Sequence, residues 1–396
     1  MSDLAAKQKK NVTVLAALQA LLLTNNSTAI ALNGLAGYAL AADKRLATLP
    51  VTGWVVGAAV TTYFASMLMK RIGRQGGFTV GAVVGILGAA ICCVALYRAD
   101  FWLFVAGTTV FGVYNAFGQS YRFAAADAAV ADFKAKAISY VLAGGLIGGI
   151  VGPTVSRFTK DTLPTAFLGA YLTLIVFLVV VLLVIRLLDI PPPTTAETKE
   201  SGRPLAEIIA QPAFVVAVLC AAFGYGVMNL LMTATPLAMG LCGHPYSAAA
   251  TVISWHVIGM FAPSFVTGDL IRRFGVLKVM LCGAALNVLC VAIALAGVEV
   301  ANFWAALLIL GVGWNFLYIG ATALLTETYR PAEKAKAQGA NDMLIFVVMA
   351  SSSFASGLLL EANGWQTLNY LALPFVAVMA VAILWLMSRR RIPVAA

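Results

Sequence analysis

Residues 166–188 read AFLGAYLTLIVFLVVVLLVIRLL, and the chain continues with DIPPP over residues 189–193. Arg186 is the one charged residue of the first stretch, and a helix of this length crosses the roughly 30 Å hydrocarbon core of a bilayer at about 1.5 Å per residue. The consecutive prolines, in contrast, favour an extended and solvated connection. The segment therefore predicts a transmembrane helix that is followed by an aqueous linker.

Similar apolar stretches recur along the whole chain. Of the 396 residues, 61% are hydrophobic and 11% are charged, and the mean hydropathy is +0.92, values that a soluble globular domain does not reach. We expect an all-α polytopic membrane protein of about twelve spans, and no cleavable signal peptide because the first apolar run is too long for one. The predicted spans are residues 12–41, 47–69, 77–97, 101–127, 137–158, 166–188, 212–239, 247–271, 276–297, 302–328, 337–360 and 365–388.

The basic residues are distributed unevenly between the two ends of these spans. Twenty of the 26 Lys and Arg residues fall on the side that also holds both termini. By the positive-inside rule, both termini are cytoplasmic in a bacterial inner membrane. The formal charge of +10 is thereby explained by topology and predicts no nucleic-acid partner. The remaining six basic residues are Lys44, Arg45, Arg98, Arg157 and Lys160 on the opposite side, and Arg122 inside a span.

The sequence also repeats itself about its middle. Residues 134–137 and 334–337 both read KAKA, and Asn115 and Asn315 keep the same offset of 200 residues. KRIG at 70–73 recurs as RRFG at 272–275. These matches indicate a duplication into an N-terminal six-helix half, residues 1–188, and a C-terminal half, residues 212–396. Residues 189–211 form the predicted cytoplasmic linker.

The loop after the second span resembles a motif of the major facilitator superfamily, in which glycine, an acidic residue, arginine and glycine precede basic residues. Ser66 and Lys70 stand where that motif has glycine and aspartate, whereas the second half keeps Gly268 but has Arg272 at the acidic position. The resemblance implies two pseudo-symmetric halves. Charged residues near the predicted cytoplasmic ends are candidates for a conformational latch, or are ordinary interfacial charges: Lys70, Arg71, Arg74, Asp127, Arg272, Arg273, Glu327 and Asp342.

No acidic side chain is predicted near the middle of the membrane. All sixteen Asp and Glu lie in loops or within about two turns of a predicted helix end. Polar residues inside the spans are mostly neutral, such as Asn115 and Asn315. They are candidates for contact with a substrate, and hydrogen bonds between packed helices are the alternative explanation. Arg122 is expected to pair with Asp127 or with neighbouring carbonyls. A carboxylate proton relay is therefore not expected.

Soft metal ligands concentrate in the seventh and eighth spans. Met228 and Met232 lie one helical turn apart, as do His256 and Met260, and all four lie at similar depth, roughly 16–26 Å from a turn near Gly243. Thioethers and imidazole suit Cu(I), whereas Mg and Ca prefer oxygen ligands. The four side chains predict a copper site, and core packing by methionine is the alternative explanation.

Further soft ligands lie toward the two ends of the same spans. Met239, Cys242 and His244 gather around the predicted outer loop, where an arriving ion would first bind. Cys220 lies toward the cytoplasmic end of the seventh span and is a candidate exit ligand. The sequence thus provides a candidate path for copper from one side of the membrane to the other.

The M-x-x-x-M and H-x-x-x-M pairs, with TATPLAM at residues 233–239 between them, resemble those of the CcoA-type bacterial copper importers. The resemblance implies copper uptake by alternating access for respiratory oxidase assembly, with copper as substrate and no permanently bound cofactor. It also implies a periplasmic copper donor and a cytoplasmic copper chaperone as partners, beside the lipid bilayer. We expect a monomer. Inward movement of one positive charge gains about 2.3 kcal/mol per 100 mV of membrane potential, which provides a driving force.

Two other functions fit the sequence. A neighbouring branch of the superfamily imports riboflavin, and an importer of riboflavin or another aromatic molecule would stack its cargo on aromatic residues within the spans. The candidate residues are Trp54, Tyr114, Tyr121, Trp255, Trp314 and Tyr318. The second alternative is a copper sensor or receptor without net transport. Enzymatic catalysis is not expected, because no nucleophile, base and orienting group can be assembled.

Overall fold

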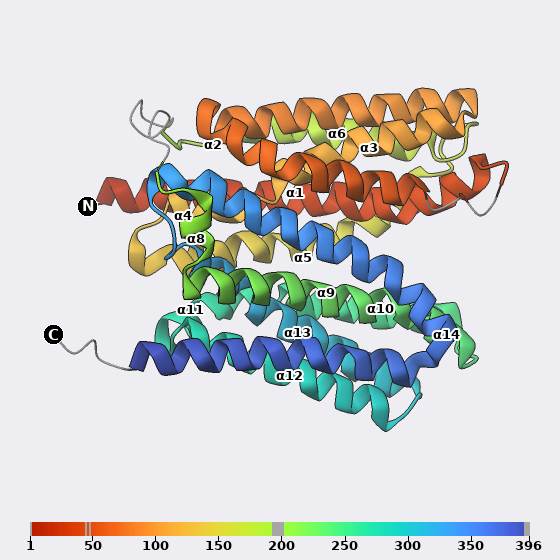
Figure 1. The fold of residues 1–396 in the computed structure, drawn as a ribbon. Helices are drawn as coiled ribbons and strands as arrows, with labels where there is room; N and C mark the ends of the chain where they lie inside the picture. Colours follow the sequence, from red (N-terminus) through yellow and green to blue (C-terminus); the bar gives the residue numbers. More distant parts are fainter. Residues whose placement is uncertain (1, 44–45, 47–48, 192–201, 392–396) are drawn as a thin grey trace. The chain divides into compact units, whose positions relative to one another are not determined.

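The computed structural model describes residues 2–43, 46, 49–191 and 202–391, and the regular elements in these ranges are helices (Figure 1). Lys44, Arg45 and most of the predicted linker lie outside the described residues. The first half contains α1 (Ser2–Leu40), α2 (Leu49–Arg98), α3 (Phe101–Gly118), α4 (Tyr121–Asp127), the 3₁₀ turn η2 (Ala131–Phe133), α5 (Lys134–Thr159) and α6 (Leu168–Ile185). The second contains α8 (Leu205–Ile209), α9 (Pro212–Leu241), α10 (Tyr246–Phe261), α11 (Ser264–Phe274), α12 (Val276–Ala296), α13 (Val300–Leu325), the 3₁₀ turn η3 (Pro331–Glu333) and α14 (Lys334–Arg391).

The number of membrane crossings follows from two helices that bend sharply. Ten helical stretches in the described ranges are long and apolar enough to span a bilayer. Two of them are much longer than one crossing needs, because α2 has 50 residues and α14 has 58. Each is interrupted at a glycine with positive φ, Gly73 (φ 79°) or Gly364 (φ 74°), a conformation that glycine adopts at little cost. The bends fall between predicted spans, so the helices accommodate the twelve predicted spans.

Two predicted spans are broken inside the membrane-spanning part. The span predicted at 101–127 is divided into α3 and α4 around Gln119 and Ser120. The span predicted at 247–271 is divided into α10 and α11 at Ala262 and Pro263, where proline removes a backbone donor. The counterparts of these two spans in the other half of the repeat are continuous. The 101–127 span corresponds to α13, and the 247–271 span corresponds to the first part of α2.

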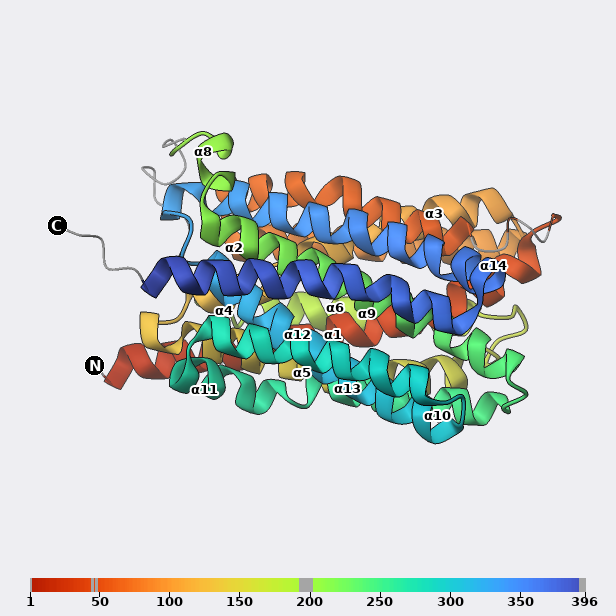
Figure 2. The same cartoon turned by 60° about the horizontal axis from the view of Figure 1, so that its bottom comes forward.

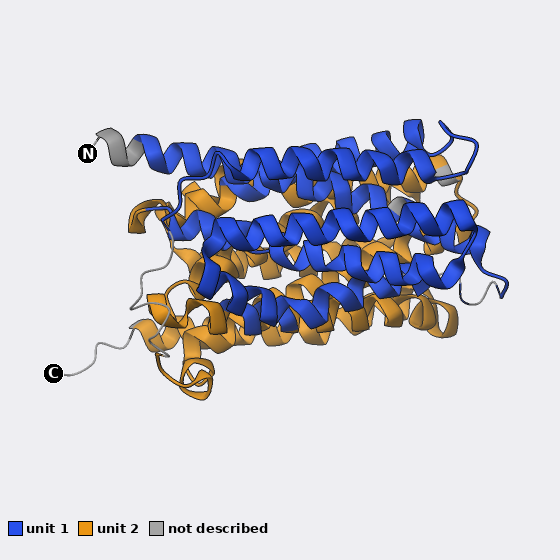
Figure 3. Ribbon diagram, turned by 90° about the horizontal axis from the view of Figure 1, so that it is seen from above, with its two compact units in different colours: residues 1–129, 140–201, 338–343 blue, residues 130–139, 202–337, 344–396 orange. Residues whose placement is uncertain are grey.

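The chain forms two compact units that differ slightly from the sequence halves (Figure 3). Unit 1 comprises residues 1–129, 140–201 and 338–343, and unit 2 comprises residues 130–139, 202–337 and 344–396. Unit 2 therefore includes the start of α5, and unit 1 includes residues 338–343 near the start of α14, whereas most of each helix belongs to the other unit. Residues 130–139 include the KAKA sequence at 134–137, and residues 338–343 directly follow the KAKA sequence at 334–337.

Close helix packing in unit 1 depends on small residues. A Cβ atom on Gly57 of α2 would lie 2.0 Å from the carbonyl oxygen of Thr109, and one on Gly112 of α3 would lie 2.1 Å from that of Trp54. Such positions accept only glycine, which lets the backbones of two membrane helices approach closely. This contact fixes the α2 segment that carries Trp54 against α3.

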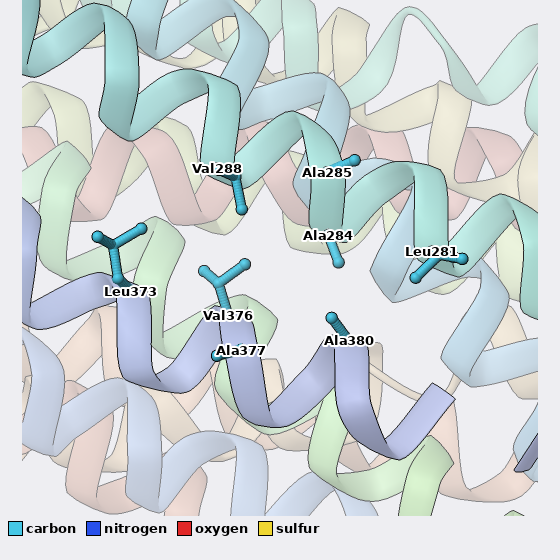
Figure 4. A pocket seen from close by; sticks show the side chains of 8 residues that line it. All are labelled: Leu281, Ala284, Ala285, Val288, Leu373, Val376, Ala377 and Ala380. Atoms are coloured by element: carbon cyan, nitrogen blue, oxygen red, sulfur yellow. The ribbon is translucent and has the colours of Figure 1, made fainter. Parts of the chain in front are cut away.

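In unit 2, α12 runs alongside the last part of α14 (Figures 1 and 2). A crevice of about 270 Å³ lies between them (Figure 4). Its lining is apolar and consists of Leu281, Ala284, Ala285, Val288, Leu373, Val376, Ala377 and Ala380. These side chains offer no hydrogen-bonding group that could orient a polar molecule.

Candidate functional site

Polar side chains gather inside unit 1 where α1 packs against α3 and α4. Asn25 and Asn26 lie in the middle of α1, and the Asn26 amide donates a 2.8 Å hydrogen bond to Asn115 Oδ1 of α3. The Tyr114 hydroxyl faces the side chains of Asn25 and Tyr121. We call these five residues the amide cluster. It combines three carboxamides with two phenols and carries no charge.

The amide cluster is buried but incompletely hydrogen-bonded. Asn25 is 0% exposed and Tyr114 is 1% exposed. Within the described part of the chain, neither amide atom of Asn25 nor the Tyr114 hydroxyl makes a hydrogen bond of full geometry, and the same holds for the indole N–H of the buried Trp54. Since each unsatisfied polar group in a membrane interior costs several kcal/mol, these groups have unused capacity for a polar molecule.

Aromatic rings gather inside unit 2. Trp314 and Tyr318 of α13 stack with ring centroids 4.8 Å apart and an interplanar angle of 17°. Tyr225 of α9 meets both edge-on, at 5.4 and 5.6 Å, and Phe261 of α10 meets Trp314 edge-on at 5.9 Å. We call these four rings the aromatic cluster. The Trp314 indole nitrogen is buried and has no hydrogen-bond partner among the described residues.

The structure brings four of the six predicted aromatic residues into one of the two clusters. Tyr114 and Tyr121 belong to the amide cluster, and Trp314 and Tyr318 form the stack. Trp255, in contrast, is 42% exposed and packs edge-on against Trp304, outside both clusters, so its place in an aromatic pocket stays a prediction. Its exposure follows from periodicity, because Trp255 and the buried His256 occupy adjacent positions that point to different sides of α10.

Sequence reasoning missed two members of the aromatic cluster. Phe261 ends α10, directly before the break at Pro263. Tyr225 lies between Gly224 and Gly226 on α9, a large ring flanked by residues without side chains. That local pattern is a signal for a ring that fills space left by small neighbours, although it names no partner.

The predicted copper ligands are largely buried, and His256 lies against α13. Its Nδ1 is 2.7 Å from the Leu307 carbonyl oxygen, and its Nε2 has no partner among the described residues. Met228 and Met260 are 2% and 7% exposed, whereas Met232 is half-buried. The bond to Leu307 fixes the imidazole ring and leaves Nε2 as the nitrogen that a ligand would reach.

The soft ligands predicted at the ends of the spans occupy different environments. Cys242 is exposed and His244 is half-buried, and His244 Nε2 lies 2.7 Å from the Val298 carbonyl oxygen. Met239 is 0% exposed, so its side chain does not share their surface, and Cys220 is likewise buried. No group of three or more His, Cys, Asp or Glu side chains that could hold a metal occurs in the described ranges.

One predicted latch contact is present in unit 1. Arg74, directly after the bend at Gly73, pairs with Asp127 at the end of α4 with a nitrogen to oxygen distance of 2.9 Å. The same guanidinium donates a 2.6 Å hydrogen bond to Gln338, which is also fully buried. The pairing of Asp127 with a base of the repeated loop is thus confirmed, while its role as a latch stays a prediction.

The other charged residues have partners that differ from those expected. Arg122 pairs with Asp342, not with Asp127, because Arg74 already occupies Asp127. Both members of the Arg122 and Asp342 pair are 2% exposed. Outside this buried pair, Glu327 pairs with Arg390, Arg272 approaches Asp269 at 3.8 Å, and Arg273 lies over the Phe274 ring. Lys70 is half-buried and Arg71 is exposed.

The family assignment agrees with the fold. The model of the Major Facilitator Superfamily matches residues 14–275 and 217–395, and the chain belongs to this superfamily of membrane transporters. Among solved structures, the chain resembles the fucose:proton symporter FucP of Escherichia coli in its outward conformation, with a TM-score of 0.80 and 16% identity over 94% of this chain and 98% of that one. It also resembles the proton:xylose symporter XylE, with a TM-score of 0.79 and 14% identity over 97% and 96% of the two chains.

Curated sequences include a more similar relative. The chain is 42% identical over 387 residues to the riboflavin transporter RfnT of Brucella anthropi, covering 97% of each protein. It is 27% identical to the uncharacterized transporter YddS of Bacillus subtilis, over 88% of this chain and 84% of that one. The protein is therefore a multi-pass transporter and not an enzyme.

Proposed function

We propose that this protein imports riboflavin, or a closely related flavin, across the bacterial cytoplasmic membrane by alternating access. The observation that carries the proposal is the 42% identity to the riboflavin transporter RfnT, which extends over 97% of both chains. Copper, the cargo suggested by the methionine and histidine pairs, has no comparable support among these relatives. Riboflavin is therefore the first candidate cargo, and copper is the second.

The two clusters match the chemistry of a flavin. Riboflavin has a planar tricyclic ring that can stack on aromatic side chains, and a ring edge and a ribityl chain that form hydrogen bonds. The stack of Trp314 and Tyr318 offers aromatic faces and edges. Asn25 and Tyr114 offer uncharged donors and acceptors. A neutral polar cargo also explains why both clusters lack charge.

The cargo changes the energetics of uptake. Riboflavin is uncharged, so the membrane potential exerts no net force on it, in contrast to a copper ion. Net accumulation then requires either consumption of the vitamin inside the cell or coupling to an ion. We propose a monomeric protein with both termini in the cytoplasm, as the distribution of basic residues indicates.

Copper import is a second candidate because of one observation. His256 is buried in a membrane helix, its Nδ1 is fixed by the Leu307 carbonyl oxygen, and its Nε2 is unpartnered. A neutral imidazole held in this way is a competent ligand for copper, and Met260 lies one turn further along the helix. The methionines are equally well explained as apolar packing.

Uptake of labelled riboflavin separates the two cargos. The protein is expressed in a riboflavin-auxotrophic bacterium without an importer of its own, and uptake of riboflavin and of copper is measured at equal membrane abundance. We expect riboflavin uptake that Trp314→Ala reduces about tenfold or more, because the stacking face is lost. Trp255→Ala, which removes an exposed ring, is the matched control and should retain uptake.

The copper arm uses His256→Ala and Met228→Ala. Copper uptake that these variants abolish, together with no uptake of riboflavin by the native protein, would overturn the proposal in favour of the second candidate. Riboflavin uptake that is insensitive to both variants, with no copper uptake, would assign these residues to packing.

A further inference from the structure

The buried amide of Asn25 is the polar group of unit 1 whose environment is least complete. Both its oxygen and its nitrogen are buried and unpartnered within the described ranges, although it lies in the middle of a membrane helix at 0% exposure. Its neighbour Asn26 differs, because it donates to Asn115. A carboxamide without partners in this environment is destabilising unless another molecule completes its hydrogen bonds.

Tyr114 adds an adjacent group of the same kind. Its hydroxyl faces Asn25, is buried, and makes no hydrogen bond of full geometry among the described residues. The ring itself is held in place by Phe111, with centroids 6.1 Å apart. The two side chains come from α1 and α3, so the unused donors and acceptors converge from different helices.

The same unit contains a second tyrosine and asparagine pair that serves as a comparison. Tyr171 of α6 is also a buried phenol on a membrane helix, and it donates a short hydrogen bond to Asn33 Oδ1, two turns beyond Asn25 on α1. Unit 1 thus contains two buried pairs of tyrosine and asparagine. Tyr171 and Asn33 are joined by a direct hydrogen bond, although Asn33 Nδ2 has no partner among the described residues. Tyr114 and Asn25 face each other without a hydrogen bond of full geometry, and we call them the open pair.

The chemistry of the open pair defines what would complete it. A carboxamide presents one donor and one acceptor side by side, and it binds bidentately to a group with the complementary pair, as Asn does to adenine. An imide edge, in which an N–H stands between two carbonyl oxygens, is such a group. The phenol can donate to a carbonyl oxygen.

We propose that Asn25 and Tyr114 bind the imide edge of the cargo's ring system and so select flavins from other planar aromatic molecules. This inference rests on the proposed function, since it assigns the recognition of the same cargo to named residues. Selectivity arises because a molecule without the edge would leave the buried amide unpaired.

The test compares three variants and the native protein with two cargos. Riboflavin and N3-methylriboflavin, which lacks the imide N–H, compete with labelled riboflavin for uptake by the native protein, Tyr114→Phe, Asn25→Ala and Tyr171→Phe. We expect the native protein to prefer riboflavin about tenfold or more over the methylated analogue. Asn25→Ala should lose this preference, and Tyr114→Phe should lower riboflavin affinity.

Tyr171→Phe is the control because it removes a buried hydroxyl that already has a partner. It should lower membrane abundance or thermal stability without changing the preference between the cargos. An unchanged preference in Asn25→Ala, with riboflavin still transported, would overturn the inference alone. Absence of riboflavin uptake by the native protein would instead overturn the proposed function. If Asn25→Ala does not reach the membrane, an unaltered riboflavin affinity in Tyr114→Phe contradicts the inference.

Discussion

The starts of α5 and α14 descend from the same repeat, yet they are held in different ways. Each follows a short 3₁₀ turn, begins with KAKA and contributes a few residues to the unit that does not contain the rest of its helix. Residues 338–343, which directly follow KAKA and are here called the α14 start, are held in unit 1 by buried charges. The α5 start, residues 130–139, is held in unit 2 by close packing, a serine hydroxyl and a partly exposed ion pair.

The contacts of the α14 start include the ion pair of the described residues in which both partners are most fully buried. Asp342 pairs with Arg122, and its carboxylate also accepts a 2.8 Å hydrogen bond from Asn341. Gln338 joins the pair of Arg74 and Asp127. Removal of one partner would leave the other charge buried and unpaired, so the pair disfavours arrangements of the helices in which the two residues are apart.

The contacts of the α5 start are mainly steric. A Cβ atom on Gly268 of α11 would lie 2.5 Å from Lys136 Cα, and the Gly268 amide donates a 3.1 Å hydrogen bond to Ser139 Oγ. Lys136 pairs with Asp269, but the two side chains are 28% and 41% exposed. Such a pair contributes little in contact with solvent.

The glycine and the serine of this helix contact occupy opposite helices in the two units. In unit 2 the glycine is Gly268 and the serine is Ser139, whereas the equivalent contact in unit 1 has Ser66 on α2 and Gly339 on α14. A Cβ atom on Gly339 would lie 3.2 Å from Ser66 Cβ. This exchange explains why Ser66 replaces the usual glycine of the motif. Duplication has preserved the close approach, but not which helix provides the glycine.

The largest effect is expected from breaking the buried pair of the α14 start. Arg122→Leu leaves the Asp342 carboxylate buried and unpaired, which should cost about 3–5 kcal/mol of folding free energy. The double variant Arg122→Leu with Asp342→Leu should recover much of the loss. Thermal unfolding of the purified protein in detergent checks both variants. A single variant as stable as the native protein would contradict the importance of this pair.

A smaller effect is expected at the neighbouring pair. Asp127→Asn removes the charge that faces Arg74 but keeps a hydrogen-bonding side chain, so we expect a loss of about 2 kcal/mol. Arg74 is 8% exposed and is left with Gln338 as a neutral partner. The same unfolding measurement applies. A loss as large as that of Arg122→Leu would show that the two pairs act as one network.

A third and smaller loss of stability is expected from steric disruption of the α5 start. Gly268→Ala places a methyl group against the backbone at Lys136, and the helices must separate, at a cost of about 1–2 kcal/mol. Transport should slow as well, because the packing of α11 changes. Gly240→Ala is the control, since no atom lies within 4 Å of a Cβ there. Equal stability of the two alanine variants would refute tight packing at Gly268.

The smallest effect is expected from the exposed ion pair of the α5 start. Lys136→Met should change stability by less than about 1 kcal/mol, since both partners contact solvent. Measurement at low and high salt sharpens the comparison, because screening should remove what little difference exists. A loss comparable to that of Arg122→Leu would mean that the two helix starts depend equally on charge.

Much of the fold could be predicted from the sequence, because long apolar stretches identify the membrane helices and the charge bias of the loops gives their orientation across the membrane. The bends at Gly73 and Gly364 fall between predicted spans for this reason. The breaks beside Gln119 and Pro263 were not predicted, since hydrophobicity continues through them. Pro263 offered a signal, whereas the break near Gln119 depends on local hydrogen bonding.

The site was harder to predict than the fold. The stack of Trp314 and Tyr318 follows from their spacing of one turn on one helix, but Tyr225 and Phe261 come from other helices and required tertiary structure. The unpaired state of Asn25 is likewise invisible in sequence, because it depends on what is missing around the side chain. The methionine and histidine pairs drew attention to metal chemistry, since spacing alone does not separate ligands from packing.

Counterflow of riboflavin in proteoliposomes tests the central claim most directly. Vesicles that contain the purified protein are loaded with unlabelled riboflavin and diluted into a trace of labelled riboflavin. We predict transient accumulation of label inside the vesicles, which Trp314→Ala abolishes and Trp255→Ala preserves. No accumulation by the native protein, in vesicles where it is folded and inserted, would contradict the assignment of a flavin as cargo.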